Sequence, residues 1–377
     1  MYSGIYIHLP ICKSRCIYCD FYSQTNPDLE GRIVESLLRE IELTARKYSD
    51  FRAHTLYLGG GTPSFFADEN IGKLLRAIIS SFTSPADDLK EITIEMNPDD
   101  VDLDKLNNYK DFGINRISLG VQSFDDKVLQ FLKRRHNANQ SLNSIELIKE
   151  SGFTNFSIDL IFAIPNQTIT QLRESLESAI ELKPSHISLY CLTYEPLTEL
   201  HNMLNSGVIA ALSDDTQAEM FREAIVMIKN AGYRQYELSN FARPGYECRH
   251  NLVYWKMGDY LGFGPSAHSL YKRTRWANYP DLKKYADYLN TERLPRNSEE
   301  RLSPERKAEE YMMLSLRLDE GIELDEYRKI SGVDLMNMKK PIVNGLIKSG
   351  LAEISGKRLR LTLDGAMVAD EIIAQLI

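Results

Sequence analysis

The chain has 377 residues, of which 43% are hydrophobic, a composition typical of a globular protein with a sizeable core. Acidic residues outnumber basic ones by 53 to 45, and the formal charge of -8 argues against a surface built for nucleic acid or anionic lipid. No apolar run approaches the roughly 20 residues of a membrane span, and the 5 cysteines are too sparse for a disulfide framework, so we expect a reducing, cytoplasmic location.

The first predicted element is a short buried strand that leads into a cysteine loop. Residues 5–21 read IYIHLPICKSRCIYCDF, with Cys12, Cys16 and Cys19 in a Cys-x3-Cys-x2-Cys spacing. An iron-sulfur cluster of the [4Fe-4S] type normally takes four cysteine ligands, so three cysteines leave one iron open to an exchangeable ligand. A structural zinc site would need a fourth Cys or His nearby, and His8 is the histidine close to the loop. The spacing favours the cluster.

From residue 1 to about 240, short β-branched or aromatic runs alternate with longer amphipathic runs, which is typical of a parallel sheet covered by helices. We therefore expect an α/β fold, an open or partial (β/α) barrel, with its chemistry at the C-terminal ends of the strands. The predicted strands are 4–8, 55–59, 92–96, 116–120, 156–161, 186–192 and 235–238. The predicted helices are 31–48, 70–80, 141–151, 169–182 and 216–231.

Polar or glycine-rich positions follow several of these strands. Gly60, Gly61 and Thr62 form a turn in which the backbone could approach a ligand closely, although simple turn chemistry would also explain the glycines. Glu95 ends the third strand, where a carboxylate is costly to bury without a cation or hydrogen-bond donors; a surface glutamate is the alternative.

The fourth and fifth strands supply three more candidates. Gln122 can both donate and accept hydrogen bonds at the barrel mouth, and Arg134 offers a planar fork suited to a carboxylate. A basic cluster at a helix end is more often a solvated cap than a ligand site. Asp159 interrupts an otherwise apolar strand, where an unpaired carboxylate would cost several kcal/mol.

The cysteine spacing after a first strand resembles the signature of radical S-adenosylmethionine enzymes, whose cofactor chelates the fourth iron through its amino and carboxylate groups. The porphyrin-related branch of these proteins binds the cofactor through corresponding motif positions. The resemblance implies the following cofactor-binding residues here: Tyr6, Tyr18, Gly60, Gly61, Thr62, Glu95, Gln122, Arg134 and Asp159. The chain departs from the pattern at Ala163, where the family more often has glycine, and this could change the loop after the fifth strand.

A second motif, His250-Asn-x-x-Tyr-Trp255, follows the predicted barrel and precedes Gly-Phe-Gly-Pro-Ser-Ala-His at 262–268. A lone histidine is more often packed and hydrogen-bonded than a ligand, yet histidine is also a common haem ligand. The motif closely resembles the HemW family of haem chaperones, and the resemblance spans nearly the full length. Cys248 precedes the motif, but no Cys-x-x-Cys-His pattern supports covalent haem attachment.

This resemblance implies three cofactors, a [4Fe-4S] cluster, S-adenosylmethionine and haem, with haem bound through or near His250. It also implies a haem-accepting protein and an electron donor for the cluster. The sequence allows a homodimer and membrane contact through a partner, and it leaves open whether radical chemistry occurs.

The alternative within the same superfamily is oxygen-independent coproporphyrinogen III oxidase, a radical decarboxylase of porphyrin biosynthesis. Three features separate the two. The oxidase carries a long N-terminal extension, whereas here eleven residues precede Cys12. It usually has a further cysteine at the position of Phe21, and it lacks the motif at His250. All three favour the chaperone.

The C-terminal residues predict a separate, mainly helical unit. Periodicity indicates helices at 305–316, 324–331 and 335–349, followed by short strands at 352–354 and 358–361, an arrangement typical of a winged helix. The acidic composition argues against DNA binding by this unit. The predicted organisation is a barrel at 1–240, a HemW-type extension at 241–290, a linker at 291–304 and a winged-helix-like domain at 305–377.

Overall fold

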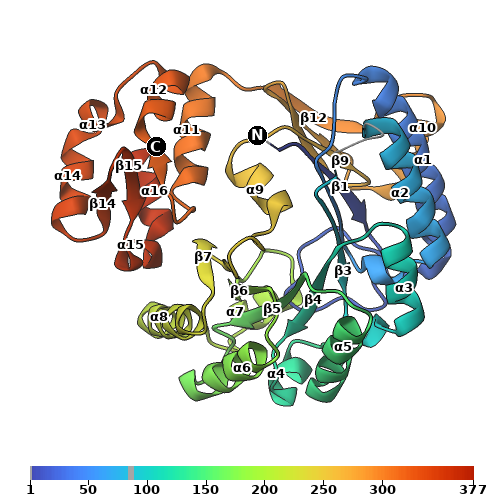
Figure 1. Ribbon diagram of the computed structural model, residues 1–377, viewed down its shortest axis with the longest axis horizontal. Coiled ribbons are helices and arrows are strands. Elements are labelled where there is room, and N and C mark those ends of the chain that lie inside the picture. Colours follow the sequence, from blue (N-terminus) through green and yellow to red (C-terminus); the bar gives the residue numbers. More distant parts are fainter. Residues whose placement is uncertain (1, 84–88) are drawn as a thin grey trace.

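The computed structural model of the protein describes residues 2–83 and 89–377. In this part of the chain the main sheet is 12-stranded, in the order β12-β11-β10-β9-β1-β2-β3-β4-β5-β6-β8-β7. The sheet is open, because β12 and β7 lie at its two edges and do not pair with each other (Figure 1). The predicted partial (β/α) barrel is therefore confirmed.

The centre of the sheet consists of parallel strands that pair in chain order. Their bounds are β1 (Gly4–Leu9), β2 (Thr55–Gly60), β3 (Glu91–Met96), β4 (Arg116–Gln122), β5 (Phe156–Phe162) and β6 (His186–Cys191). Antiparallel pairing then adds β8 (Asn240–Ala242) and β7 (Arg234–Glu237). The predicted strands agree with these bounds to within one or two residues.

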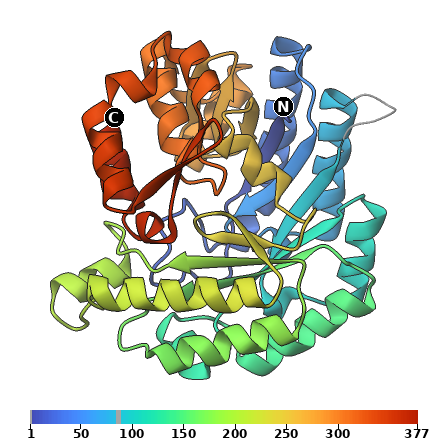
Figure 2. The ribbon, with the colours of Figure 1, turned by 60° about the vertical axis from the view of Figure 1, so that its left-hand side comes forward.

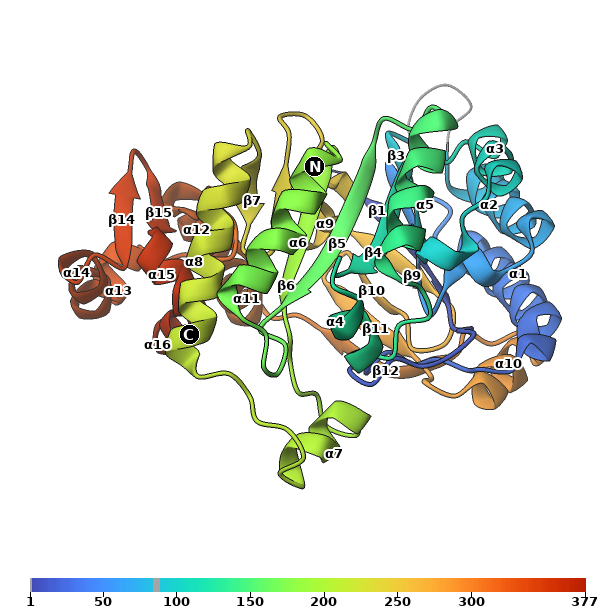
Figure 3. The ribbon, with the colours of Figure 1, turned by 90° about the horizontal axis from the view of Figure 1, so that it is seen from below.

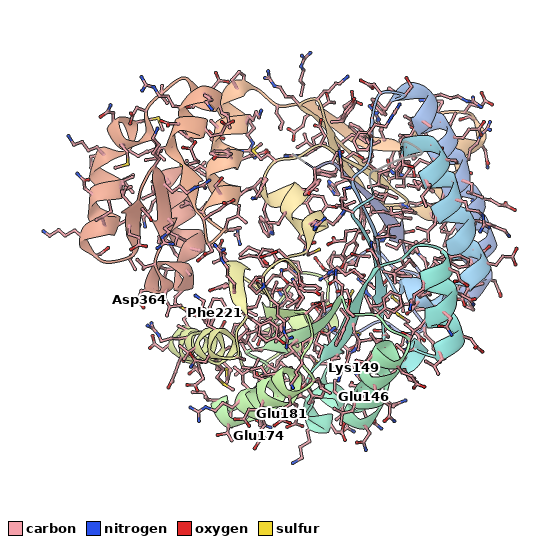
Figure 4. All side chains as sticks on the ribbon, viewed as in Figure 1. Glu146, Lys149, Glu174, Glu181, Phe221 and Asp364 are labelled. Atoms are coloured by element: carbon pink, nitrogen blue, oxygen red, sulfur yellow. The ribbon has the colours of Figure 1, made fainter. Side chains whose placement is uncertain are left out.

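Helices cover the outside of the parallel strands. They are α1 (Glu30–Lys47), α2 (Asp68–Phe82), α3 (Leu103–Asp111), α4 (Asp126–Phe131), α5 (Ala138–Glu150), α6 (Ile169–Glu181) and α8 (Asp214–Asn230), with 3-10 turns at Pro27–Leu29, Pro63–Phe65 and Pro98–Asp100. A short helix after β6, α7 (Glu199–Asn205), does not lie on this surface. Capping boxes start α5 and α6. Charged side chains occupy their outer faces, including the pair of Glu146 and Lys149 and the exposed Glu174 and Glu181 (Figure 4).

Residues beyond 241 continue the same sheet. Strand β9 (Tyr260–Phe263) pairs in parallel with β1, and β10 (His268–Tyr271), β11 (Thr274–Asn278) and β12 (Arg296–Arg301) follow in antiparallel order. Helix α10 (Leu282–Asn290) packs on α1. Glu40 of α1 ties the two together, because its carboxylate accepts hydrogen bonds from Tyr285 Oη at 2.6 Å, Asn278 Nδ2 at 2.6 Å and the Gly264 N–H at 2.8 Å.

The linker expected at 291–304 is wrong as a description of its middle part. Residues 296–301 are strand β12, which pairs with β11 from Thr274 to Asn278. The sequence Arg-Asn-Ser-Glu-Glu-Arg conceals the strand because β12 lies at the edge of the sheet, where exposed charged residues are favoured.

The C-terminal unit has its own apolar core and lies beside the barrel (Figure 2). Its helices are α11 (Pro304–Ser315), α12 (Leu324–Ser331), α13 (Leu335–Met338), α14 (Lys340–Lys348), α15 (Leu363–Met367) and α16 (Ala369–Leu376), and its strands are β13 (Ile322–Glu323), β14 (Ala352–Ser355) and β15 (Arg358–Leu361). The mainly helical, winged-helix-like prediction is confirmed. One predicted helix is divided at Lys339, because Pro341 in the first turn of α14 lacks an N–H and therefore begins a helix more readily than it continues one.

Helix α9 (Arg249–Trp255) lies inside the opening of the barrel rather than on its outer surface (Figure 1). It contacts β2 on one side and α11 of the C-terminal unit on the other. None of the helices in the described residues is both long enough and apolar enough to cross a membrane.

Candidate cofactor site

The cysteine loop follows β1 at the C-terminal edge of the parallel strands. Cys12, Cys16 and Cys19 are free thiols, and all three line a cavity of about 670 Å³. Burial raises the pKa of Cys12 and raises that of Cys19 to about 11. In residues 2–83 and 89–377, no three His, Cys, Asp or Glu side chains are grouped closely enough to hold a single metal ion.

The loop is fixed from both sides. The Cys12 N–H donates to the carbonyl of Gln24 at 2.8 Å, and the Gln24 N–H donates to the carbonyl of Pro10 at 2.6 Å. On the other side Leu200 of α7 donates its N–H to the carbonyl of Ile17 at 2.9 Å. Figure 3 shows α7 standing out from the rest of the barrel. The loop is thus anchored on either side of Cys16, at Cys12 and at Ile17.

The glycine turn after β2 closes one wall of the cavity. Gly60 has a φ of 115°, which favours glycine, and its N–H donates to Glu95 Oε2 at 3.1 Å. A Cβ at Gly60 would lie 2.5 Å from the His8 ring, and a Cβ at Gly61 would lie 2.7 Å from the carbonyl oxygen of Ile11. Only glycine therefore fits at these two positions, because any side chain would collide with its neighbours.

Two carboxylates face this cavity from β3 and β5. Glu95 accepts from Tyr57 Oη at 2.9 Å as well as from Gly60, while Asp159 accepts from Ser118 Oγ at 2.8 Å and from Ser157 Oγ at 2.7 Å. The pKa of Glu95 is raised to about 7, chiefly by burial and to a smaller extent by the charge of Asp159, although the hydrogen bonds from Tyr57 and Gly60 act to lower it. An approaching cation or hydroxyl group would meet two acceptors that are already oriented.

Lys133, Arg134 and Arg135 are consecutive basic residues, and the side chain of Arg134 points to the cysteine loop. Lys133 pairs with Glu199 at 2.6 Å, and Arg135 pairs with Asp99 at 2.9 Å. Arg134 donates to Cys16 Sγ at 3.3 Å, and its buried Nε has no partner.

Asn97 holds this arginine in place and was not expected from the sequence. Its Oδ1 accepts from Arg134 at 2.5 Å, and its Nδ2 donates to Thr62 Oγ1 at 3.1 Å. The sequence feature that could have identified Asn97 as a site residue is its position directly after β3, at the C-terminal edge of the sheet. Tyr57 and Ser118, which orient the two carboxylates, lie within strands and carried no such signal.

The remaining predicted cofactor residues differ in position. Tyr18 and Gln122 line the cavity, and Gln122 adopts a left-handed φ of 68°, a strained conformation for a residue with a side chain. Tyr6 lies behind the wall, with its Oη 3.0 Å from His8 Nδ1. Ala163, where the resembling family more often has glycine, has a φ of 62°, so the loop after β5 keeps the turn that glycine would favour.

These observations fit an iron-sulfur cluster with an attached amino-acid cofactor. The thiols, the side-chain-free turn, the unpaired Arg134 Nε and the carboxylates of Glu95 and Asp159 converge on one cavity. Thiolates are the usual ligands of such clusters. A carboxylate and backbone groups suit an ammonium, and an arginine suits a carboxylate.

His250 lies elsewhere, in the first turn of α9 near the N-terminal ends of β1 and β2. It is 1% exposed, and both ring nitrogens are engaged: Nδ1 with Thr55 Oγ1 at 2.9 Å and Nε2 with Tyr254 Oη at 2.8 Å. Burial lowers its pKa to about 3, with a further lowering from Arg116. His250 is therefore neutral and has no free nitrogen in this conformation, so its role as a haem ligand stays a prediction.

A second cavity, of about 310 Å³, lies between α9, the extension strands and α11. Apolar and aromatic side chains such as Tyr254, Met257 and Met313 line part of it, and the charged side chains of Arg275, Arg306, Glu309 and Glu310 line the rest. Tyr254 thus stands between His250 and this cavity.

Comparisons with known proteins agree with the geometry. The Radical SAM superfamily model matches residues 6–179, and the HemN C-terminal domain model matches residues 302–368. The heme chaperone HemW of Bacillus subtilis is 34% identical over 370 residues, which span 97% of this chain and 97% of that protein. The heme chaperone HemW of Escherichia coli is 37% identical over 270 residues, 70% of this chain and 69% of that protein.

Among solved structures, coproporphyrinogen III oxidase (HemN) from Escherichia coli resembles the fold over 100% of this chain and 90% of that chain. The TM-score is 0.87 at 22% sequence identity. Likeness at this level of identity describes the fold alone.

Proposed function

The chain belongs to the HemW family of radical S-adenosylmethionine proteins, and from this premise we propose that it is a cytoplasmic haem chaperone. It carries a [4Fe-4S] cluster on Cys12, Cys16 and Cys19, binds S-adenosylmethionine in the adjoining cavity, and binds haem that it passes to an acceptor protein. An electron donor reduces the cluster.

The observation that supports this proposal best is the shared cavity of about 670 Å³. It brings the three cysteines together with the glycine turn, Glu95, Gln122, Arg134 and Asp159, which come from separate strands and loops. Bound in this cavity beside a cluster held by Cys12, Cys16 and Cys19, S-adenosylmethionine would supply one-electron chemistry.

The residues of this chain bind and orient that cofactor. Glu95 and the backbone of Gly60 and Gly61 hold its ammonium group, because the turn leaves no room for a competing side chain. Asp159 accepts from the ribose hydroxyls, since both of its oxygens are oriented by serine hydroxyls. Arg134 stabilises negative charge beside Cys16, through the hydrogen bond from its Nη1 to the sulfur.

Haem binding belongs to the region around α9. Direct ligation by His250 requires release of Tyr254 or Thr55, because these residues occupy its ring nitrogens. The apolar part of the cavity beside Tyr254 offers a surface for one face of a porphyrin.

The cluster is tested by changing Cys12, Cys16 and Cys19 together to serine and reconstituting the protein anaerobically. We expect the iron-sulfur absorbance and the bound iron to disappear. The matched control is Cys191→Ser, which removes an exposed thiol that lines the same cavity outside the loop. Unchanged iron content in the triple variant would refute the cluster assignment.

The haem function is tested by titrating haem into the reconstituted wild type, His250→Ala and the control His201→Ala. The proposal predicts stoichiometric binding that only His250→Ala weakens. The same wild-type preparation is assayed for coproporphyrinogen decarboxylation with cofactor and reductant. Turnover without stoichiometric haem binding would support the oxidase instead of the chaperone.

A further inference from the structure

A chain of hydrogen bonds crosses the inside of the barrel, from the start of α9 to the cofactor cavity. The Cys248 N–H lies 3.3 Å from Tyr236 Oη, which lies 2.9 Å from His186 Nε2. His186 Nδ1 lies 3.0 Å from Ser157 Oγ, and Ser157 Oγ donates to Asp159 Oδ1 at 2.7 Å. The first four of these residues are buried.

The chemistry of these groups fixes the direction of every bond. The Cys248 N–H can only donate, so Tyr236 Oη accepts from it, and the Tyr236 hydroxyl proton is left free to be donated to His186 Nε2 when that nitrogen carries no proton. An ionised Asp159 can only accept, so Ser157 donates to it and must accept from His186 Nδ1. Burial lowers the pKa of His186 well below its usual value, which leaves one ring proton, and that proton lies on Nδ1. All donors thus point toward the carboxylate.

We propose that His186 and Tyr236 are positioning residues that hold Asp159 in its cofactor-binding orientation and link it to the first turn of helix α9. This inference rests on the proposed function, because it assumes that Asp159 contacts the cofactor. It adds that the position of helix α9, which carries His250, and the binding of the cofactor in the cavity are coupled. By linkage, a ligand that moves α9 and the cofactor change each other's affinity by the same factor.

The start of α9 is well placed to transmit such a change. Glu91 accepts from the N–H groups of Arg249 and His250, each at 3.0 Å, so the first turn is anchored to β3. The same turn supplies the Cys248 N–H to Tyr236. A shift of α9 therefore alters the first donor of the hydrogen-bond chain, the Cys248 N–H, before it alters the cavity wall.

The first test is the affinity of the anaerobically reconstituted holoprotein for S-adenosylmethionine, measured by its perturbation of the reduced cluster's EPR signal. Tyr236→Phe removes one hydroxyl and keeps the ring, and we expect the Kd to rise about three- to tenfold. The matched control is Tyr233→Phe, which removes the hydroxyl of another buried tyrosine, one that donates to the carbonyl of Pro184 at 2.7 Å outside the chain. Its Kd should equal that of the wild type.

A second pair of variants separates positioning from packing. His186→Leu removes both ring nitrogens, whereas His186→Asn keeps a donor toward Ser157. The inference predicts weaker cofactor binding in the leucine variant and substantial recovery in the asparagine variant. Cofactor addition should also slow hydrogen exchange of the amides at residues 248–257 in the wild type, and less so in Tyr236→Phe.

The outcomes distinguish the two proposals. A wild type that binds no S-adenosylmethionine contradicts the proposed function. A wild type that binds it, with equal Kd values in Tyr236→Phe, both His186 variants and Tyr233→Phe, contradicts the positioning role alone. An equal rise in Tyr236→Phe and Tyr233→Phe would also overturn it, because general loss of packing would then explain the effect.

Discussion

Replacing Glu95 by glutamine should stabilise the cofactor-free protein at alkaline pH while weakening its affinity for S-adenosylmethionine. The pKa of Glu95 is raised from 4.5 to about 7, chiefly by burial. The folded protein therefore holds the proton more tightly than the unfolded chain does. Ionisation of Glu95 lowers stability progressively as pH rises from about 4.5 to 7, by about 3 kcal/mol when complete.

Glutamine avoids this cost because it stays neutral. Its amide nitrogen must replace an oxygen that accepts from Tyr57 or Gly60, which costs about 1 kcal/mol. We expect Glu95→Gln to be more stable than the wild type by about 2 kcal/mol at pH 8, and less stable by about 1 kcal/mol at pH 4.5. Urea unfolding of the cluster-free proteins between pH 4.5 and 8 measures the difference. A wild type that gains on the variant as pH rises would refute the reasoning.

Glu40→Gln is the matched control for the functional half of this prediction. Burial also raises the pKa of Glu40 to about 7, yet Glu40 binds Tyr285 and Asn278 away from the cavity. Both variants should show the same sign of pH dependence. Only Glu95→Gln should weaken cofactor binding, by about tenfold or more, because it removes a charge-assisted hydrogen bond. Equal cofactor affinity in the two variants would show that Glu95 has no contact with the cofactor.

Two further predictions concern the cavity wall and the cluster. Gly61→Ala should abolish cofactor binding, because the added Cβ would lie 2.7 Å from a backbone oxygen, whereas the control Gly31→Ala has nothing within 4 Å and should leave binding unchanged; equilibrium dialysis measures both. Arg134→Gln should make the reduction potential of the cluster more negative, because Cys16 loses a hydrogen bond that stabilises its negative charge. Redox titration with Arg135→Gln as control tests this, and equal shifts in both variants would contradict it.

Much of the barrel could be predicted because its signals are local. The run Ile92–Met96 is short and rich in β-branched residues, and polar residues follow it. Residues adjacent in sequence are therefore enough to predict both the strand and the candidate Glu95. The cysteine loop is equally local. The extension from β9 to β12 was missed because the parallel pairing of β9 with β1 joins residues far apart in sequence, and β12 is polar or charged at every position.

The interior of the barrel was also beyond sequence reasoning, for a different physical reason. Tyr57, His186 and Tyr236 are ordinary strand residues whose importance depends on which side chains face them across the sheet. The resemblance singled out Arg134 from its basic neighbours, but the reason that Lys133 and Arg135 point elsewhere, their carboxylate partners Glu199 and Asp99, required the fold. The sequence predicts which residues lie at the C-terminal edge of the sheet. It does not predict which side chains they contact there, because those contacts depend on the fold.

The buried charges below the cavity are best explained by helix α9. Glu91 and Arg116 are both buried, and burying ionised groups is costly unless hydrogen bonds and neighbouring charges compensate. Glu91 accepts the first N–H groups of α9, which have no partner within the helix, and its charge acts favourably on Arg116. An open sheet leaves its interior to be filled by something other than strand side chains. In this chain a short helix fills it, and the buried charges hold that helix where its first turn can reach the residues behind the cofactor cavity.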